Sequence, residues 1–188
     1  MPLWFVETTV NARSWSSVKR NNAYTIWARY LRRMLRPMRI AITSDHNGVS
    51  LKRHLIEWLD SHGHEVEDRA PHVADEPVDY PPLCEDVCRR VLDGRADYAI
   101  VVGGSGSGEA IACNKIRGIR AGLCLDLFVT EIARGNNDAN VLVTGAKVVS
   151  PELAERIVET WLATPFRGER HRRRLDQIAA LERGESLL

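Results

Sequence analysis

Glu109 follows a glycine-rich stretch, and the combination has the groups needed for acid–base chemistry on a carbonyl compound. Residues 103–108 read Gly-Gly-Ser-Gly-Ser-Gly, and an apolar run over 98–102 comes directly before them. Glycines let a backbone approach a ligand closely, and the N–H groups at a helix start attract anions. A carboxylate beside such N–H groups offers a base and an oxyanion hole, which proton abstraction next to a carbonyl group requires. The same residues also fit a tight turn whose acid stabilises a helix N-terminus, so the loop alone leaves both interpretations open.

The common nucleotide-binding glycine loops have requirements that this stretch does not meet. A dinucleotide fingerprint needs its third glycine where Glu109 stands, and it belongs to the first strand–helix turn rather than to the third. A Walker loop ends in Gly-Lys-Ser or Gly-Lys-Thr, and this stretch does not. We therefore expect a small phosphorylated ligand rather than a nucleotide.

Other polar residues could contact such a ligand. His46 comes directly after a predicted strand, where it could bind a phosphate or cap a helix, and Tyr80 could line a pocket or pack on its loop. Clustered arginines could bind a phosphate bidentately, although a solvated helix face explains part of the cluster. The cluster consists of Arg170, Arg172, Arg173 and Arg174. Four other histidines have the pattern of surface residues and predict no metal site. They are His54, His62, His64 and His72.

Alternating strand and helix patterns from Met38 onward position these residues. Strands are predicted at 39–43, 64–68, 98–102, 121–125 and 141–144. Helices are predicted at 51–62, 83–92, from 110, 127–134, 151–163 and 171–182. Asp126 and Ser150 are the expected N-caps, and residues 75–82, with three prolines, are predicted as a loop. Such an alternation predicts a parallel α/β sheet whose ligands bind beyond the carboxyl ends of the strands.

Length and charge limit the class of protein. The 188 residues suffice for one α/β domain with a sizeable core. The formal net charge of +1 suggests neither a nucleic acid nor a membrane surface as partner. No apolar run approaches the roughly 20 residues that a membrane-spanning helix needs.

Residues 1–37 differ in composition from residues 38–188. They hold seven Lys and Arg against one acid, Glu7, whereas the rest holds 19 against 24. This Arg-rich, acid-poor character resembles a transit peptide. A disordered extension, or a start codon assigned too far upstream, would look the same. We favour the upstream start, because a clean strand pattern begins after Met38, and we predict one domain over 38–188.

The four cysteines indicate a reducing compartment. Their spacing does not match a zinc site, so we expect free buried thiols and a cytoplasmic location. They are Cys84, Cys88, Cys113 and Cys124.

Several short motifs between Met38 and Glu182 occur together in one order. They are Asp45-His46, Asp79-Tyr80-Pro81, Gly103 to Glu109, Ala112 to Lys115, Gly118 to Arg120, Asn137 to Asn140, and Arg170-His171 with Arg174. In combination they resemble the type B ribose-5-phosphate isomerases, a family that includes the galactose-6-phosphate isomerase subunits. The resemblance implies a Rossmann-like three-layer sandwich around a five-stranded parallel sheet. It also implies a homodimer or a dimer of dimers with sites at the subunit interface, and no nucleic-acid or membrane partner.

The resemblance implies interconversion of aldose and ketose phosphates through a cis-enediolate, without metal or cofactor. One branch of the family has a cysteine base where this chain has Gly103; this chain looks like the other branch, whose base corresponds to Glu109. Ser105 and the N–H groups of the loop would hold the enediolate oxygen, and Asp45 would line the sugar site. The residues implied in substrate binding are His46, Tyr80, Gly104, Gly106, Gly108, Asn114, Asn136, Asn137, Lys147, Arg170 and Arg174. Among them His46, Arg170 and Arg174 would hold the phosphate, while Lys147 would come from the neighbouring subunit.

One departure from the family pattern concerns the opening of the sugar ring. Members that act on ribose 5-phosphate usually have a histidine where this chain has Asn136. An amide can donate and accept hydrogen bonds but cannot shuttle a proton at neutral pH. The resemblance makes ribose 5-phosphate the default substrate, and the missing histidine makes a tetrose or hexose phosphate the alternative. A non-catalytic sugar-phosphate-binding module is the rival from another class, and the carboxylate of Glu109 argues against it.

Overall fold

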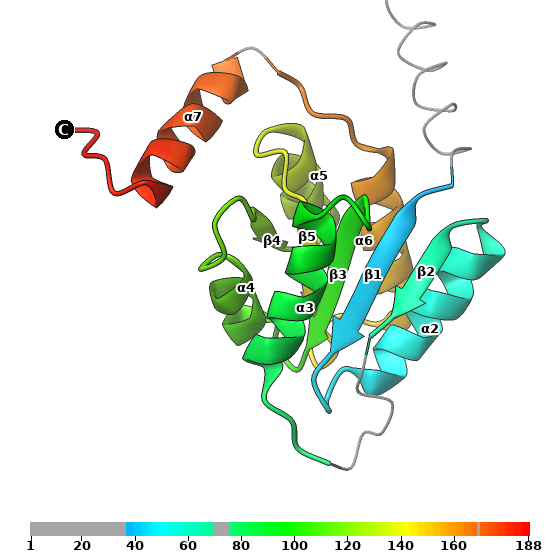
Figure 1. Cartoon of the computed structure of the whole chain (residues 1–188). Coiled ribbons are helices and arrows are strands. Elements are labelled where there is room, and N and C mark those ends of the chain that lie inside the picture. Colours follow the sequence, from blue (N-terminus) through cyan, green and yellow to red (C-terminus); the bar gives the residue numbers. More distant parts are fainter. Residues whose placement is uncertain (1–36, 70–75, 169) are drawn as a thin grey trace, which may run out of the picture.

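A parallel five-stranded sheet forms the centre of the molecule (Figure 1). The computed structural model describes residues 37–69, 76–168 and 170–188, so residues 1–36 of the predicted extension lie outside the described residues. The strands are β1 (Arg39–Ser44), β2 (Glu65–Asp68), β3 (Tyr98–Gly103), β4 (Ala121–Leu123) and β5 (Val141–Gly145). They lie in the order β2-β1-β3-β5-β4, and all neighbouring pairs are parallel. The predicted fold class is therefore confirmed.

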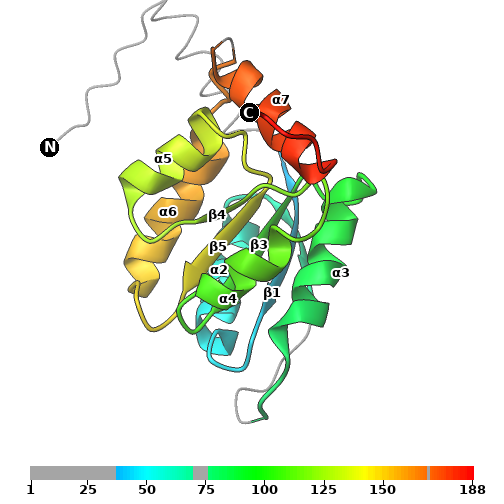
Figure 2. The same ribbon diagram turned by 90° about the vertical axis from the view of Figure 1, so that its left-hand side faces the viewer.

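Helices cover both faces of the sheet and complete the three layers (Figure 2). They are α2 (Val49–Ser61), α3 (Tyr80–Leu92), α4 (Ser107–Cys113), α5 (Leu127–Gly135), α6 (Pro151–Ala163) and α7 (Arg170–Glu182). One apolar core joins α2, α5 and α6 to the sheet face that carries Ile40 and Ile42. A second core joins α3 and α4 to the opposite face, which carries Ala41. Successive strand residues point to opposite faces, so a strand between two cores is apolar almost throughout. Among the helices described, none is long and apolar enough to cross a bilayer.

Helix α3 begins earlier than the sequence predicts, so the predicted loop over 75–82 is wrong at its end. The helix starts at Tyr80 with Asp79 as N-cap, and Pro81 and Pro82 lie in its first turn. Proline suits this position because the first N–H groups of a helix have no intrahelical partner. Tyr80 is therefore held on a helix rather than on a loop.

Helix α4 also begins earlier than predicted. Its first residue is Ser107, and Gly106 precedes it with φ of 80°. Glu109 therefore lies inside the first helical turn, which fixes the direction of its side chain. The two N-caps predicted further on are confirmed, because Asp126 accepts from the Val129 N–H and Ser150 from that of Leu153.

Helix α7 lies apart from the sheet, beyond the amino ends of the strands (Figure 1). Residues 164–168 lead to it from the end of α6. Its last turn returns to the domain where Glu182 accepts a hydrogen bond from the Gly118 N–H at 3.3 Å. The pocket described below lies at the opposite end of the strands.

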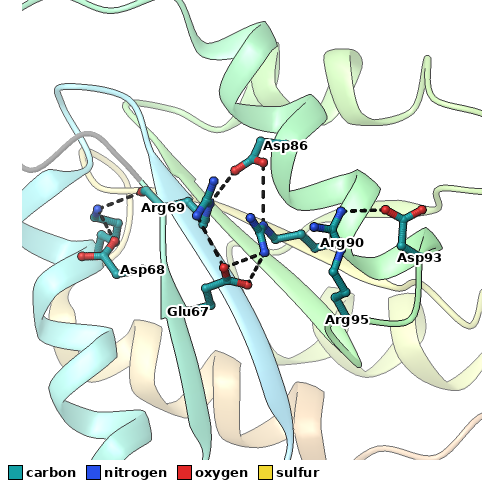
Figure 3. Close-up of polar contacts among 8 residues, drawn as sticks. Glu67, Asp68, Arg69, Asp86, Arg90, Asp93 and Arg95 are labelled. Carbon is teal, nitrogen blue, oxygen red and sulfur yellow. Dashed lines mark hydrogen bonds and ion pairs between the residues drawn. The ribbon is translucent and has the colours of Figure 1, made fainter.

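Ionic contacts hold the edge strand β2 against α3 (Figure 3). Arg69 Nε donates to Asp86 Oδ2 at 2.6 Å, and Arg90 lies 2.6 Å from Glu67. A weaker contact of 3.4 Å between Arg69 and Glu67 closes the network. These contacts position the helix that begins at Tyr80.

A buried lysine anchors the end of the same strand. Lys52 of α2 is 2 % exposed and forms an ion pair with Asp68. Its ammonium group also donates to the Arg69 carbonyl at 3.1 Å. The end of β2 is thus tied to helices on both faces of the sheet.

Candidate active site

A pocket of about 590 Å³ lies at the carboxyl ends of β1 and β3. It combines three chain segments, which are the loop after β1, the residues around the start of α3, and the glycine loop with the first turn of α4. Its lining residues are Asp45, His46, Asn47, Pro77, Val78, Asp79, Tyr80, Gly104, Ser105, Gly108 and Glu109. The three residues expected to be catalytic, Glu109, Ser105 and Asp45, therefore come together in one chain. So do four of those expected to bind substrate: His46, Tyr80, Gly104 and Gly108.

The carboxyl group of Glu109 occupies the space above Gly103. A Cβ atom built on Gly103 would lie 2.3 Å from the Glu109 carboxyl carbon, closer than two such atoms can approach. Glu109 is only 4 % exposed, although it lines the pocket. A glycine at the end of β3 is thus a condition for the buried position of this carboxyl group.

The surroundings of Glu109 favour its protonated form more than water does. Burial raises the pKa of its carboxyl group, its own backbone N–H lowers that pKa by less, and the charge of Asp45 raises it further. A carboxylate with a raised pKa is a stronger base once ionised, which suits proton abstraction from carbon. Glu109 is therefore the strongest candidate for a general base in the pocket.

Asp45 has a different environment. Its Oδ1 accepts from the N–H groups of Asn47 and Gly48, both at 2.9 Å. Its Oδ2 accepts from the Asn47 side chain at 2.8 Å. Three donors hold this carboxylate in place, so it shapes the loop after β1.

Tyr80 packs directly on the glycine loop. A Cβ atom on Gly108 would lie 2.6 Å from the Tyr80 hydroxyl oxygen, so this glycine lets the phenol reach the pocket. One helical turn further on, the Cys84 thiol donates to the Glu109 carbonyl at 3.9 Å. One face of α3 thus supports the first turn of α4. Sequence reasoning missed this role of Cys84, although its spacing of four residues from Tyr80 puts both on one face.

The cysteines near the site are buried thiols with raised pKa values. All four cysteines are free and buried, as predicted. A hydrogen bond with Cys113 raises the pKa of the Cys84 thiol, and burial raises it further. Thiols of this kind are not nucleophiles at neutral pH. They leave Glu109 as the candidate for chemistry in this part of the site.

His46 lies at the rim of the pocket. Its Nδ1 accepts from the Val78 N–H at 3.5 Å, and its Nε2 lies 3.1 Å from the Asn47 amide nitrogen. The ring therefore joins the loop after β1 to the segment before α3. Asn47 and Val78 were not foreseen as lining residues, although Asn47 is the direct neighbour of a predicted one.

Two other expected residues also lie at or near this end of the sheet. Gly106 is buried, and a Cβ atom there would lie 2.9 Å from the Thr144 carbonyl oxygen. Lys147, which the resemblance assigns to the neighbouring subunit, is exposed in the loop after β5, and its N–H donates to the Gly104 carbonyl of its own chain at 2.9 Å.

The remaining expected residues lie away from the pocket within the same chain. Asn136 is the C-cap of α5, and Arg170 and Arg174 are exposed on α7, at the opposite end of the strands (Figure 1). Asn137 and Asn114 line a second cavity of about 460 Å³ beside α7. Both ends of the Asn114 amide bond to backbone groups of Ala110 and Ala121. The expected site is thus divided between the carboxyl ends and the amino ends of the strands.

The turn that follows Asn136 is held rigidly by two arginines. Asp138 has φ of 45°, a left-handed conformation that a non-glycine residue adopts at a cost. Arg134 donates to Asp138 Oδ1 at 3.0 Å and to the Ala139 carbonyl at 2.6 Å. Arg120 donates to the carbonyl groups of Asn137 and Asp138, both at 3.0 Å. Such a fixed turn at the chain's second group of polar residues suits a binding role.

Comparisons with known proteins agree on one family. Residues 40–178 match the model of the family described as "Ribose/Galactose Isomerase". The chain is 39 % identical over 144 residues to ribose-5-phosphate isomerase B of Escherichia coli, covering 77 % of this chain and 96 % of that protein. It is 36 % identical over 147 residues to ribose-5-phosphate isomerase B of Mycobacterium tuberculosis, covering 78 % and 91 %. The structure of Clostridium thermocellum ribose-5-phosphate isomerase B superimposes with a TM-score of 0.77 at 42 % identity, over 79 % of this chain and all of that one.

Proposed function

The chain belongs to the ribose/galactose isomerase family, and we propose that it interconverts an aldose phosphate and a ketose phosphate with Glu109 as the base. Ribose 5-phosphate and ribulose 5-phosphate are the default pair. The observation that carries this assignment is the buried Glu109 carboxyl group above Gly103, in a pocket large enough for a pentose phosphate. We also propose that residues 38–188 form the isomerase domain and that it works in the cytoplasm, where free thiols persist.

The reaction moves one proton from carbon 2 to carbon 1, and a second proton from the oxygen on carbon 2 to the oxygen on carbon 1. In the open-chain substrate, Glu109 takes the proton from the carbon next to the carbonyl group, which leaves an enediolate. Ser105 and the N–H groups from Gly104 to Gly108 stabilise the charge on oxygen. Glu109 then returns the proton to the neighbouring carbon. The substrate gains and loses no electrons overall, so the step calls for no redox cofactor.

We propose that a second copy of the chain completes each site. One copy supplies the pocket at the carboxyl ends of the strands, and the other supplies the polar residues at the amino ends. The supplied residues are Asn136, Asn137, Arg170 and Arg174. In a two-fold dimer the carboxyl ends of each chain's strands would meet the amino ends of the other's. Such a dimer contains two of these contacts and therefore two sites.

The arrangement of exposed apolar side chains supports a dimer. Ile111 on α4 and Phe128 on α5 are 61 % and 72 % exposed. Ile178 and Leu181 on α7 are 41 % and 57 % exposed. Large apolar side chains on elements that carry the divided site are what an interface between copies would bury.

Hydrogen exchange at carbon 2 tests the enzyme assignment. The purified protein is incubated with ribose 5-phosphate in deuterated water, and incorporation of deuterium at carbon 2 is followed by mass spectrometry. An isomerase incorporates the label and forms ribulose 5-phosphate. Binding of pentose phosphates without any exchange would instead identify a non-catalytic binding module.

Asn136 favours a second candidate substrate. A tetrose 4-phosphate cannot close a furanose ring, because its terminal oxygen carries the phosphate, so it needs no ring-opening histidine. The kcat/KM values for four-, five- and six-carbon sugar phosphates distinguish the candidates. A tetrose phosphate with the highest value would displace ribose 5-phosphate as the substrate.

A further inference from the structure

Arg167 lies against the end of α5 and contacts Asn136. Its Nη1 donates to Asn136 Oδ1 at 3.0 Å, and its backbone N–H donates to the Gly135 carbonyl at 2.8 Å. Its Nη2 forms an ion pair with Glu131 on the same helix. Both the backbone and the guanidinium group of Arg167 are therefore held by the last turns of α5.

Gly135 leaves room for this arrangement. A Cβ atom on Gly135 would lie 3.1 Å from Arg167 Nε and 3.2 Å from its Cζ, which is tighter than an ordinary contact. A Cβ atom at this position would make the guanidinium group shift by a few tenths of an ångström. Gly135, Asn136 and Arg167 thus form one packed unit, although Arg167 is 31 residues from Asn136 in sequence.

The contact with Arg167 sets the orientation of the Asn136 amide. Since Oδ1 accepts from the guanidinium group, both Nδ2 hydrogens are directed elsewhere. A flipped amide would place N–H donors against the N–H donors of arginine, which have no acceptor to offer. Among the described residues, Asn136 has no other side-chain hydrogen bond, so its donors remain available to a ligand.

Arg167 is poorly placed to bind the phosphate itself. Bidentate binding of a phosphate uses two guanidinium nitrogens in parallel. The two terminal nitrogens of Arg167 are directed to Glu131 and Asn136 within its own chain. Its effect on a ligand therefore passes through Asn136.

We infer that Arg167 is a positioning residue that presents Asn136 as a hydrogen-bond donor to the open-chain form of the sugar phosphate in the partner's pocket. This inference rests on the proposed function, in which the second copy supplies Asn136. The open-chain form has oxygens that accept from Nδ2. Opening a closed ring would instead need a base for its anomeric hydroxyl, and neither an amide nor a guanidinium group acts as a base at neutral pH.

The experiment measures the binding of ribitol 5-phosphate, a reduced and permanently open-chain analogue, by calorimetry. We expect Arg167→Ala and Asn136→Ala each to weaken binding about three- to tenfold, the worth of one hydrogen bond. The double variant should bind no more weakly than Asn136→Ala alone, because Arg167 acts through Asn136. Arg183→Ala is the matched control: it removes an exposed arginine that is also paired with a glutamate, and it should bind as the wild type does.

Several results would overturn the inference. One is that Arg167→Ala binds ribitol 5-phosphate as tightly as the wild type does. Another is that the losses of affinity in the two single variants multiply in the double variant. A third is that the wild type does not bind ribitol 5-phosphate at all. Gly135→Ala provides a second route, because its methyl group shifts the guanidinium group slightly without removing it, and it should weaken binding by less than Arg167→Ala does. The kcat and KM for ribose 5-phosphate are measured in parallel. If the variants weaken ribitol 5-phosphate binding as expected but the wild type does not turn over ribose 5-phosphate, only the isomerase assignment is refuted. If the wild type turns over ribose 5-phosphate but Arg167→Ala does not weaken ribitol 5-phosphate binding, only this inference is refuted.

Discussion

At the scale of single residues, the position of one carboxyl group above one glycine accounts for the expected chemistry. Glu109→Gln keeps the size and hydrogen bonding of the side chain but removes the base. We expect kcat to fall at least about 100-fold with little change in substrate binding, since general bases contribute about 10²–10⁴. Steady-state kinetics measure this fall, and Glu159→Gln, an exposed change on α6, serves as the control. Near-normal turnover would show that another residue is the base, and Asp45 would be the next candidate.

The pH dependence of turnover follows from the same carboxyl group. Glu109 must be ionised to act as a base, and its folded-state pKa is raised. Activity is therefore retained at high pH and lost as the pH falls through that raised pKa. The acid limb of kcat against pH should lie above the ordinary glutamate value of about 4.3. An acid limb at or below that value would contradict the buried position of the carboxyl group.

Gly103 offers a separate test of that position. Gly103→Ala adds one methyl group where the Glu109 carboxyl lies. We expect kcat to fall by at least about tenfold, because misplacing a reacting group by about 1 Å can cost 100-fold. Circular dichroism should remain that of the folded protein. Unchanged kinetics would show that the carboxyl group does not depend on this space.

At the scale of elements, the ionic network between β2 and α3 holds the helix that carries Tyr80. Arg90 is 14 % exposed and contacts both Glu67 and Asp86. We expect Arg90→Met to lower the free energy of unfolding by about 1–2 kcal/mol, the worth of charged hydrogen bonds that are partly shielded from water. The matched control is Arg95→Met, whose exposed pair with Asp93 should contribute less than about 1 kcal/mol. Urea unfolding measures both, and equal effects would show that the network has no special role.

The elements were easier to predict from sequence than the contacts between them. Strands and helices follow from local apolar spacing, and the glycine loop with Glu109 is a single continuous stretch. The start of α3 was misplaced because prolines suit both a loop and the first turn of a helix. The contact between Arg167 and Asn136 could not be predicted, because it depends on how residues 164–168 fold back onto α5. That the expected site residues lie at opposite ends of the strands likewise could not be known before the strands and helices were placed in the fold.

At the scale of the whole molecule, the divided site predicts complementation between two inactive variants. Glu109→Gln damages the half of the site at the carboxyl ends of the strands. The double change Arg170→Ala with Arg174→Ala damages the half on α7. Each variant alone should be nearly inactive. Unfolding and refolding an equal mixture forms heterodimers with one intact site, so activity should recover to about a quarter of the wild-type value. No recovery, in a mixture shown to exchange subunits, would mean that each site belongs to a single chain.

The predicted domain boundary can be tested by removing residues 1–37. A chain that begins at Met38 keeps every strand that the structure describes, together with the pocket and α7. We expect its melting temperature and kcat/KM to match those of the full chain. A melting temperature lowered by several degrees would show that the removed residues stabilise the domain.

Helix α7 lies beyond the amino ends of the strands, so a chain could fold correctly without being able to catalyse the reaction alone. If the site is shared between two copies as proposed, a single chain would bury its two apolar cores and still be inactive, since Arg170 and Arg174 lie at the opposite end of the strands from Glu109 (Figure 1). Specific activity would then depend on how often two chains meet, and dilution would switch the enzyme off while leaving every protomer intact. Two copies damaged at opposite ends of the strands could then rescue one another, whereas a copy damaged at both ends would inactivate any sound copy that it joins.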